Sequence, residues 1–431
     1  MIKIIDLFAG LGGIRLGFQK AMDELGLETE CVFSSEIKPY AIKAYKGFYG
    51  DEKIFGDITK VDVADIPDFD FLLAGFPCQP FSSAGSRKGF KDTRGTMFFE
   101  IERILDGKIK SGHPAQGFLL ENVEGLINHD GGDTLRIIIE HLEALGYHVT
   151  YKLLDSQFFG LPQSRKRVYI VGSLHKKIDL DNFPERCATL ESVLEHGLPT
   201  IQSEFTKKLF ENYKPEEVIG KAIKDKRGGG DNIHSWDIDL KGSTSRNERE
   251  LLNKILKERR KKHWAEEIGI DWMDGMPLTE EQIRTFYNNS NLSAMLQDLT
   301  KKGYLTYEHP KKLVEVDGVM TRVPDKNLPR GYNIVAGKLS FEFSKILDPK
   351  ELAPTLVAMD VSKLGVVDGS GLRRLSIREC QRMCGYPDDY NLDCVSEKDA
   401  FDLLGNTVCV PVIKSVAMRL GEHYQIPEGD M

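Results

Sequence analysis

Short apolar runs alternate with amphipathic stretches over roughly the first 180 residues. In the stretch 134–145, apolar residues recur at the spacing of one buried helix face. A second helix is expected over about 14–25. Runs separated by amphipathic helices are typical of a parallel sheet covered by helices. The predicted strands are Ile2–Leu7, Cys31–Ser35, Phe71–Ala74, Phe118–Leu120, Val149–Leu153 and Val168–Val171.

The pattern becomes polar and irregular from about 185 to 370 and turns regular again from 371. Three helices are expected within this middle segment, the second opened by a capping box of Thr279 and Gln282. A hairpin is expected around Asp317-Gly318, because Asp-Gly between β-prone runs favours a type I′ turn. The predicted elements are helices 248–263, 279–287 and 292–302 and hairpin strands 313–316 and 319–323.

Length and composition narrow the class of protein. The 431 residues exceed one average core, and no stretch of ~18 apolar residues occurs that could span a membrane. Seven cysteines, mostly in apolar runs, indicate a reducing, cytoplasmic compartment. Cys380 and Cys384 lack the second close pair that a zinc site requires, so no metal is expected.

The net charge of -8 argues, taken for the whole chain, against a nucleic-acid partner. Residues 205–330 nevertheless hold 24 Lys and Arg against 21 Asp and Glu, a local excess of +3. Net charge averages over surfaces that a partner never meets. The distribution therefore allows a nucleic-acid contact made by a few placed cations.

A glycine turn, Gly10-x-Gly12-Gly13, follows the first predicted strand. Such a turn lets a nucleotide approach the backbone closely, and Glu36 after the next strand could accept ribose hydroxyls. Arg15 replaces the third glycine of the dinucleotide fingerprint, which favours an adenosine ligand without phosphates, such as S-adenosylmethionine. The alternative is a plain tight turn between strand and helix.

Two other polar groups, Cys78 and Glu121, follow predicted strand ends, where α/β proteins bind ligands, and a third group precedes the predicted strand Val168–Val171. Cys78 is placed to act as a nucleophile, and the polar, basic loop 82–95 after it could close over an anionic substrate. Glu121 could protonate a ring nitrogen. Arg165 and Arg167 share one face of an extended segment and could address a base oxygen and a phosphate. The alternatives are a packed thiol, a surface-paired glutamate and a solvated basic loop.

Together these motifs resemble the C5-cytosine DNA methyltransferase family over about 1–173 and 371–415. The resemblance implies an α/β fold: a Rossmann-like S-adenosylmethionine-dependent methyltransferase sheet with a second, smaller target-recognition domain. The implied domains are 1–184 (catalytic), 185–370 (target recognition, with a winged-helix element at 279–323) and 371–431 (the return that completes the catalytic domain). The motifs are Asp6-Leu7-Phe8-Ala9-Gly10-Leu11-Gly12-Gly13, Glu36, Gly56-Asp57-Ile58, Pro77-Cys78-Gln79, Glu121-Asn122-Val123, Gln163-Ser164-Arg165-Lys166-Arg167, the region Arg373–Pro387 and Gly405-Asn406-Thr407.

The resemblance also implies roles for individual residues. Cys78 attacks cytosine C6, and Glu121 engages N3 and the amino group. Arg167 holds the base oxygen, and Arg165 supports the site or a phosphate. The implied S-adenosylmethionine-binding residues are Phe8, Gly10, Leu11, Gly12, Glu36, Ile37, Asp57, Ile58, Pro77, Asn406 and Val408. The expected DNA-contacting residues are Gln79, Ser82, Arg87, Lys88, Arg94, Lys254, Arg259, Arg260 and Gln297.

The implied reaction is methyl transfer to C5 of a cytosine flipped out of double-stranded DNA. The expected protein is a monomeric bacterial modification enzyme of a restriction-modification system, with any cognate restriction endonuclease acting separately. Three rival functions remain at this point. A tRNA cytosine-5 methyltransferase would carry a Cys-Phe-Thr motif, which is absent, and a silent DNA-binding homologue would lack Cys78 or Glu121. A nicotinamide-dependent thiol enzyme is disfavoured by Arg15.

Overall fold

The computed structural model describes residues 1–77, 96–226, 232–272, 275–316, 319–335 and 341–424. The chain divides into two compact units. The first unit contains Met1–Glu195, Pro349–Ser362 and Leu375–Met431, and the second contains His196–Asp348 and Lys363–Arg374. The first unit therefore includes a short segment, Pro349–Ser362, from within the middle region that the sequence set apart.

The first unit is built on a seven-stranded sheet in the order β3-β2-β1-β4-β5-β7-β6. Each predicted strand is present, some longer than expected. The sheet is not wholly parallel as the alternating pattern predicted, because β7 runs antiparallel to both β5 and β6. The strands are β1 (Ile2–Leu7), β2 (Thr29–Ser35), β3 (Ile54–Phe55), β4 (Phe71–Gly75), β5 (Gly117–Val123), β6 (His148–Asp155) and β7 (Lys166–Ser173).

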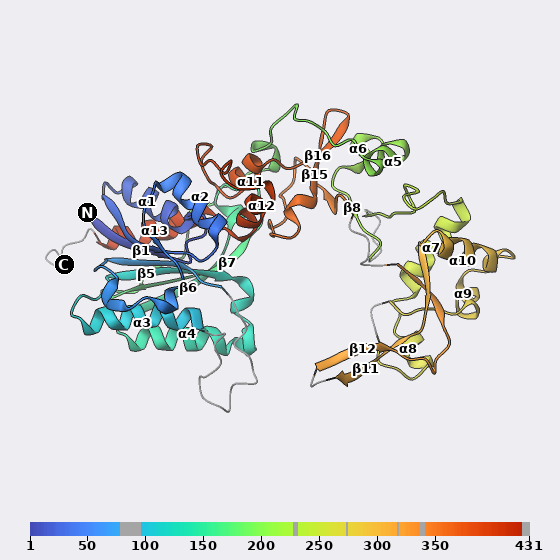
Figure 1. Cartoon of the computed structure of the whole chain (residues 1–431), viewed down its shortest axis with the longest axis horizontal. Coiled ribbons are helices and arrows are strands. Elements are labelled where there is room, and N and C mark those ends of the chain that lie inside the picture. Colours follow the sequence, from blue (N-terminus) through green and yellow to red (C-terminus); the bar gives the residue numbers. More distant parts are fainter. Residues whose placement is uncertain (78–95, 227–231, 273–274, 317–318, 336–340, 425–431) are drawn as a thin grey trace. The chain divides into compact units, whose positions relative to one another are not determined.

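Helices cover both faces of this sheet, which makes three layers (Figure 1). Apolar side chains of α1 and α13 pack on one face with Ile4 and Leu73, and those of α3 and α4 pack on the other with Ile5 and Leu72. Alternate residues of one strand thus serve two cores, as the period of a strand requires. The helices are α1 (Gly13–Glu24), α2 (Pro39–Tyr49), α3 (Thr96–Lys110), α4 (Asp133–Ala144), α11 (Ile377–Met383), α12 (Glu397–Asn406) and α13 (Val410–Tyr424).

The C-terminal part of the chain completes the first unit. Ser376 and Glu379 form the predicted capping box at the start of α11. Within the described part of the chain, no single helix is long and apolar enough to cross a membrane; α12 and α13 meet that test only as a pair bent by 41°. The apolar face of α13 is buried against α1.

The second unit has two cores. One lies on a five-stranded sheet in the order β16-β15-β14-β8-β9 and contains Phe205, Leu209 and Phe343. The other lies among helices and contains Trp236, Leu252 and Leu296; we call residues 246–334 around it the helical lobe. The elements of the five-stranded part are α5 (Glu204–Asn212), α6 (Pro215–Val218), β8 (Ala222–Ile223), β9 (Asn232–Ile233), β14 (Lys345–Ile346), β15 (Leu364–Asp368) and β16 (Gly371–Arg374).

The helical lobe contains the helices and hairpin that the sequence predicts, with one difference. The basic helix ends at Glu258 instead of 263, because the indole N–H of Trp264 donates to the Glu258 carbonyl at 2.9 Å and a separate helix follows. The Thr279–Gln282 capping box is confirmed. The elements are α7 (Arg246–Glu258), α8 (His263–Glu267), α9 (Glu280–Phe286), α10 (Leu292–Lys301), β10 (Leu305–Glu308), β11 (Lys311–Val316), β12 (Val319–Pro324) and β13 (Gly331–Ile334).

Candidate functional site

The glycine turn lies at the carboxyl end of β1, between the strand and α1. Phe8, Gly10 and Gly12 all have positive φ, at 55°, 53° and 68°. A Cβ on Gly12 would come within 2.4 Å of the Tyr49 ring, so only glycine fits this position. The turn thus exposes backbone at the sheet edge where α/β proteins bind nucleotides.

Glu36 joins this turn to the end of β2. Its carboxylate accepts hydrogen bonds from the backbone N–H of Gly10 at 2.8 Å, of Ile37 at 2.8 Å and of Lys38 at 2.9 Å. These donors fix the carboxylate at the mouth of the turn. Two carboxylate oxygens offer about four acceptor positions, so room remains for a ligand hydroxyl.

Residues predicted to meet adenine lie beside Glu36 in the chain and after β3. Ile37 is 69% exposed, which is unusual for a large apolar residue. The Asp57 carboxylate accepts a hydrogen bond from the Thr59 hydroxyl at 2.7 Å and another from the Thr59 backbone N–H at 3.1 Å. These two bonds lower the pKa of the Asp57 carboxyl. Ile58 is buried in the core.

The C-terminal return brings two more predicted residues toward the turn. Val408 is buried, and a Cβ placed on Gly13 would lie 2.8 Å from its methyl group. Asn406 is exposed at the end of α12, where its amide donates to the Asp402 carbonyl at 2.9 Å. Leu11 is buried under Tyr390, whose hydroxyl donates to the Leu11 carbonyl at 2.6 Å.

The carboxyl end of β4 leads to the predicted nucleophile. Gly75 pairs with Glu121 across β4 and β5, and the Asn122 amide donates to the Phe76 carbonyl at 3.1 Å. Pro77 is exposed. Cys78 follows directly in the chain and, with Gln79, Ser82, Arg87, Lys88 and Arg94, lies outside the described residues.

Glu121 and Arg167 form a buried ion pair beside this strand end. Glu121 Oε1 lies 3.0 Å from Arg167 Nε, and the two side chains are 11% and 16% exposed. Burial raises the pKa of the Glu121 carboxyl against the opposing effect of Arg167, and burial lowers the pKa of the Arg167 guanidinium. A carboxyl with a raised pKa keeps its proton to higher pH than an exposed carboxyl and can donate it.

Arg165 is buried and bound to backbone carbonyls. Its buried guanidinium donates to the carbonyls of Leu356 at 2.8 Å, Gly405 at 3.2 Å and Thr407 at 2.5 Å. These carbonyls use its Nη donors, so Arg165 clamps the C-terminal return and does not offer these donors to a phosphate; the clamp is compatible with the implied role of supporting the site. Gln163, whose side chain the sequence left without a separate role, joins this clamp by donating to the Met383 carbonyl at 3.1 Å.

The predicted DNA-contacting residues of the second unit fall into two groups. Lys254, Arg260 and Gln297 are at least partly exposed. Arg259 is only 4% exposed and donates to the Asn333 side chain at 2.6 Å, so its expected phosphate contact is replaced by packing inside the helical lobe. The sequence of the basic run 254–262 does not indicate which of its cations is buried.

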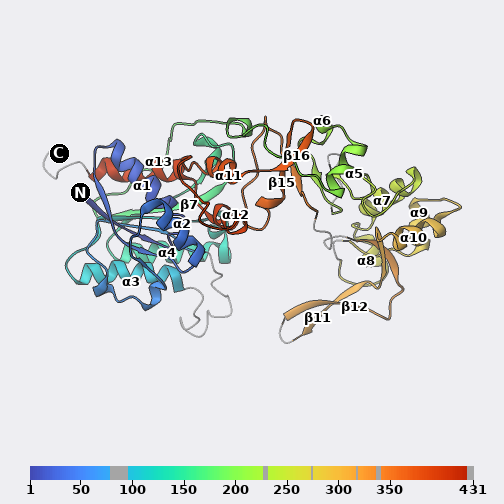
Figure 2. The same cartoon turned by 45° about the horizontal axis from the view of Figure 1, so that its top comes forward.

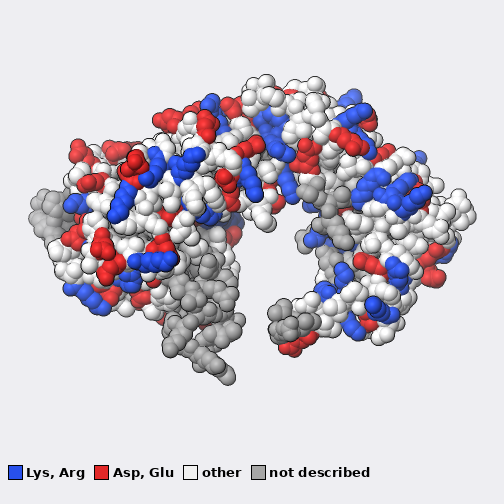
Figure 3. Space-filling view, viewed as in Figure 1, with Lys and Arg blue, Asp and Glu red and all other residues white. Residues whose placement is uncertain are grey.

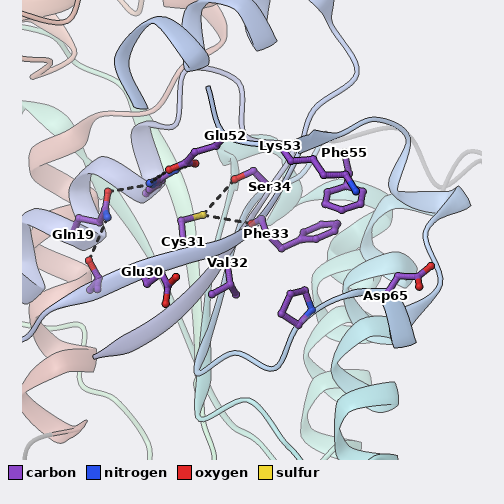
Figure 4. A pocket seen from close by; sticks show the side chains of 13 residues that line it. Gln19, Glu30, Cys31, Val32, Phe33, Ser34, Glu52, Lys53, Phe55 and Asp65 are labelled. Carbon is purple, nitrogen blue, oxygen red and sulfur yellow. Dashed lines mark hydrogen bonds and ion pairs between the residues drawn. The ribbon is translucent and has the colours of Figure 1, made fainter. Parts of the chain in front are cut away.

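Arg15 and Asp6 belong to a buried network that the sequence did not reveal. Arg15 pairs with Glu52 at 2.6 Å and donates to the Tyr45 hydroxyl at 2.9 Å. It lines a pocket of about 570 Å³ beside β2 that also holds Cys31 (Figure 4). Asp6, buried under Tyr45, has its pKa raised to about 8 by burial. Arg15, which stands at the position of the third glycine of the dinucleotide fingerprint, thus has a side chain that binds Glu52 and Tyr45.

Neither the distribution of charged side chains (Figure 3) nor that of metal-binding groups points to a further feature among the described residues. Basic and acidic side chains are interspersed over the face shown in Figure 3. Among the residues that the structure describes, no group of three His, Cys, Asp or Glu side chains could hold a metal ion. The candidate site residues of the first unit described above lie around the ends of β1, β2, β4 and β5.

Comparisons with known proteins agree along nearly the whole chain. A family model described as C-5 cytosine-specific DNA methylase matches residues 2–422. The Type II methyltransferase M.NlaIV of Neisseria lactamica is 56% identical over 97% of this chain and 98% of that protein. The Type II methyltransferase M.BanI of Aneurinibacillus aneurinilyticus is 41% identical over 96% and 94%.

The fold is also found among solved structures. DNMT2 of Spodoptera frugiperda has a TM-score of 0.52 and 18% identity, with 97% of this chain and 99% of that chain covered. The Dnmt2 methyltransferase of S. pombe has a TM-score of 0.51 and 16% identity, with 99% and 100% covered. At these identities the likeness extends to the fold alone.

Proposed function

The chain belongs to the C-5 cytosine-specific DNA methylase family and is a DNA cytosine-5 methyltransferase, and from that premise we propose how its residues divide the work. The methyl donor is S-adenosylmethionine, the substrate is a cytosine flipped out of duplex DNA, and Cys78 is the nucleophile. The enzyme serves as the modification partner in a Type II restriction-modification system, as the names of its relatives suggest.

The glycine turn fits the adenosine part of this donor. Glu36 is held by three backbone donors and keeps acceptor positions for ribose hydroxyls. The exposed Ile37 side chain offers an apolar face for adenine, and Asp57 with Ile58 meets the edge of the base. Phe8, Gly10, Leu11, Gly12, Pro77, Asn406 and Val408 complete this proposed pocket. When bound, S-adenosylmethionine supplies the methyl group.

The base-activating residues supply a thiolate and a proton. Cytosine C5 is a poor nucleophile until a thiolate adds at C6. Cys78 makes this bond while Glu121 protonates N3, which makes C5 electron-rich enough to take a methyl group. Loss of the C5 proton and of the thiol then restores the aromatic ring. Arg167 orients Glu121 and holds the base oxygen.

The observation that carries this assignment is the buried Glu121–Arg167 pair beside the end of β4. The Glu121 carboxyl is enclosed, has a raised pKa and is held by a guanidinium. These properties fit the role of a proton donor better than a purely structural role. Gly75 pairs with Glu121 and precedes Cys78 by three positions in the chain, which supports the proposal that both groups serve one site.

Transfer of labelled methyl from S-adenosylmethionine to duplex DNA tests the proposal, with tRNA as the competing substrate. Label is expected in the duplex with the wild-type chain and is expected to be absent with Cys78→Ser. Label in tRNA would favour the tRNA methyltransferase, and label that survives in the variant would rule out Cys78 as nucleophile. Arg87 and Lys88 in the loop after Cys78 stay proposed DNA contacts, with Gln79, Ser82, Arg94, Lys254 and Arg260.

A further inference from the structure

We propose that the helical lobe is a winged helix-turn-helix that reads the target sequence, with α10 in the major groove and the β11–β12 hairpin as a wing against the duplex. This inference rests on the proposed function only in taking duplex DNA as the partner. It assigns the recognition of the DNA target sequence to one segment of the second unit, since the catalytic residues do not determine which sequence is methylated.

The order and pairing of the elements carry the first step. Helices α7, α8, α9 and α10 follow one another in the chain, and a short extended segment at Leu278 lies between α8 and α9. That segment pairs antiparallel with Tyr332 of β13, and β13 pairs antiparallel with β10. The two-stranded sheet of β10 and β13 is thus extended by a single bridge to Leu278 on the other side of β13, and the hairpin is inserted between β10 and β13.

Two close contacts hold this arrangement. The Leu278 N–H donates to the Tyr332 carbonyl at 3.0 Å, and the Tyr332 N–H donates back at 2.7 Å. A Cβ on the adjacent Gly331 would come within 2.6 Å of the Leu278 backbone, so the strand approach requires glycine there. The core of the lobe joins α7, α9 and α10 to this sheet through residues such as Leu252, Ile283 and Leu296.

The helix pair α9 and α10 has the form of a helix-turn-helix. Residues 287–291 connect the two helices, and the Ser293 hydroxyl of α10 donates to Glu280 of α9. Arg284 donates to Ser293 from the same side at 3.3 Å. These bonds use Ser293 inside the motif. In a helix-turn-helix the second helix enters the major groove, and α10 holds that position here.

The outer face of α10 carries a polar stripe. Leu292, Leu296 and Leu299 face the core, and the opposite side leaves a row of exposed residues at helical spacing. We call this row the recognition stripe: Asn291, Ala294, Gln297 and Lys301. The Asn291 side chain makes no capping hydrogen bond to its own helix. Amide side chains bind adenine, lysine binds guanine, and a small apolar side chain contacts the thymine methyl.

The β11–β12 hairpin lacks the packing that its own stability would require. Figures 1 and 2 show it extending away from α7–α10, and none of its described side chains belongs to the core of the lobe. Met320 is 61% exposed. A two-stranded hairpin without a packed face is marginally stable in water. A wing that gains its partner on the duplex accounts for this exposed element.

The charges of the segment suit a duplex more than a protein partner. Residues 289–330 hold seven Lys or Arg against five Asp or Glu, in a chain whose overall charge is -8. The wing itself contributes Lys311, Lys312 and Arg322 against Glu315 among its described residues. Cations of this kind contact phosphates and fix the position of a protein on the duplex, while the inserted helix contacts the bases.

Selection of duplexes from a randomised pool tests the inference without relying on methyl transfer. Duplexes retained by the full-length protein are sequenced for the wild type, Gln297→Ala, Gln297→Arg and Lys301→Ala. We expect Gln297→Ala to lose about 5-fold to 150-fold discrimination at one base pair. Gln297→Arg should shift the preferred base there toward guanine. Lys301→Ala should weaken guanine discrimination at a neighbouring base pair or lower the salt dependence of binding.

The control is Gln202→Ala, an exposed glutamine of the second unit outside the helical lobe. Thermal unfolding of all four variants should match the wild type, because the three substituted side chains, Gln202, Gln297 and Lys301, are exposed. Retained sequences that stay the same in both Gln297 variants would overturn the inference, as would a wild-type chain that retains no duplex. Altered retention in a chain that transfers no methyl group would support the winged helix and refute the proposed chemistry instead.

Discussion

Replacing Arg165 by lysine tests whether this residue clamps the C-terminal return or acts on the base. The arginine spans the carbonyls of Leu356, Gly405 and Thr407 with one rigid guanidinium. A lysine ammonium keeps the charge but is a single point that cannot reach all three carbonyls. Arg165→Lys should therefore leave two of them unpaired in a buried region.

The expected cost follows from those two lost contacts. A hydrogen bond to a charged group contributes about 1.5–3 kcal/mol, so Arg165→Lys should lower the free energy of unfolding by about 3–6 kcal/mol. That is a large part of the 5–15 kcal/mol typical of a domain. Because Thr407 lies between Asn406 and Val408, we also expect the Kd for S-adenosylmethionine to rise.

Urea unfolding and calorimetric titration with S-adenosylmethionine measure both effects. Lys166→Ala is the matched control, since Lys166 is adjacent in the chain and exposed. A variant with unchanged stability and unchanged cofactor affinity, but a reduced kcat, would refute the clamp and return Arg165 to the base.

Three other predictions concern buried charges. The pKa of Asp6 is raised from 3.8 to about 8 in the folded chain, so the folded chain keeps a proton that the unfolded chain loses, and the free energy of unfolding should fall by about 5 kcal/mol as pH rises from 4 to 8. Asp6→Asn should remove this pH dependence, as measured by urea unfolding. The same pH dependence in the variant would show that Asp6 is not its source. The rate of methyl transfer should decline as pH rises through the raised pKa of Glu121. Glu121→Gln should lower kcat by about 10²–10⁴-fold. If the pH–rate profile of the variant shows the same decline at high pH, the decline belongs to another group. Arg15→Met should lower the free energy of unfolding by about 1–3 kcal/mol because it leaves Glu52 unpaired, and a calorimetric titration should show unchanged cofactor affinity; weakened binding would place Arg15 in the pocket.

Periodicity predicted the first unit well because its strands are buried on both faces. The run Phe71–Ala74 is apolar throughout, and Ile2–Leu7 is apolar except for Lys3 and Asp6; single-sequence patterns detect such runs directly. Strand direction leaves no such trace, so the antiparallel β7 was missed. The segment Pro349–Ser362 was placed with the wrong unit because its link to Arg165 joins residues far apart in the chain.

The candidate site was predictable where a motif fixes the backbone and less so where a side chain could turn either way. Gly12 shows its role through a conformation and a close approach that only glycine allows. Arg165 and Arg259 are basic residues in polar sequence, and nothing local distinguishes a cation that meets solvent from one that binds buried carbonyls. Tertiary partners such as Thr407 and Asn333 decide between these fates.

A duplex that carries 5-fluorocytosine at the target site tests the central claim most directly. Fluorine at C5 leaves no proton to remove after methyl transfer, so a chain that attacks C6 stays bonded to the base. Mass spectrometry of the digested complex should find the nucleotide on the peptide that contains Cys78, and Cys78→Ser should give no adduct. An adduct on another residue, or methylated cytosine formed by the Cys78→Ser chain, would contradict the account.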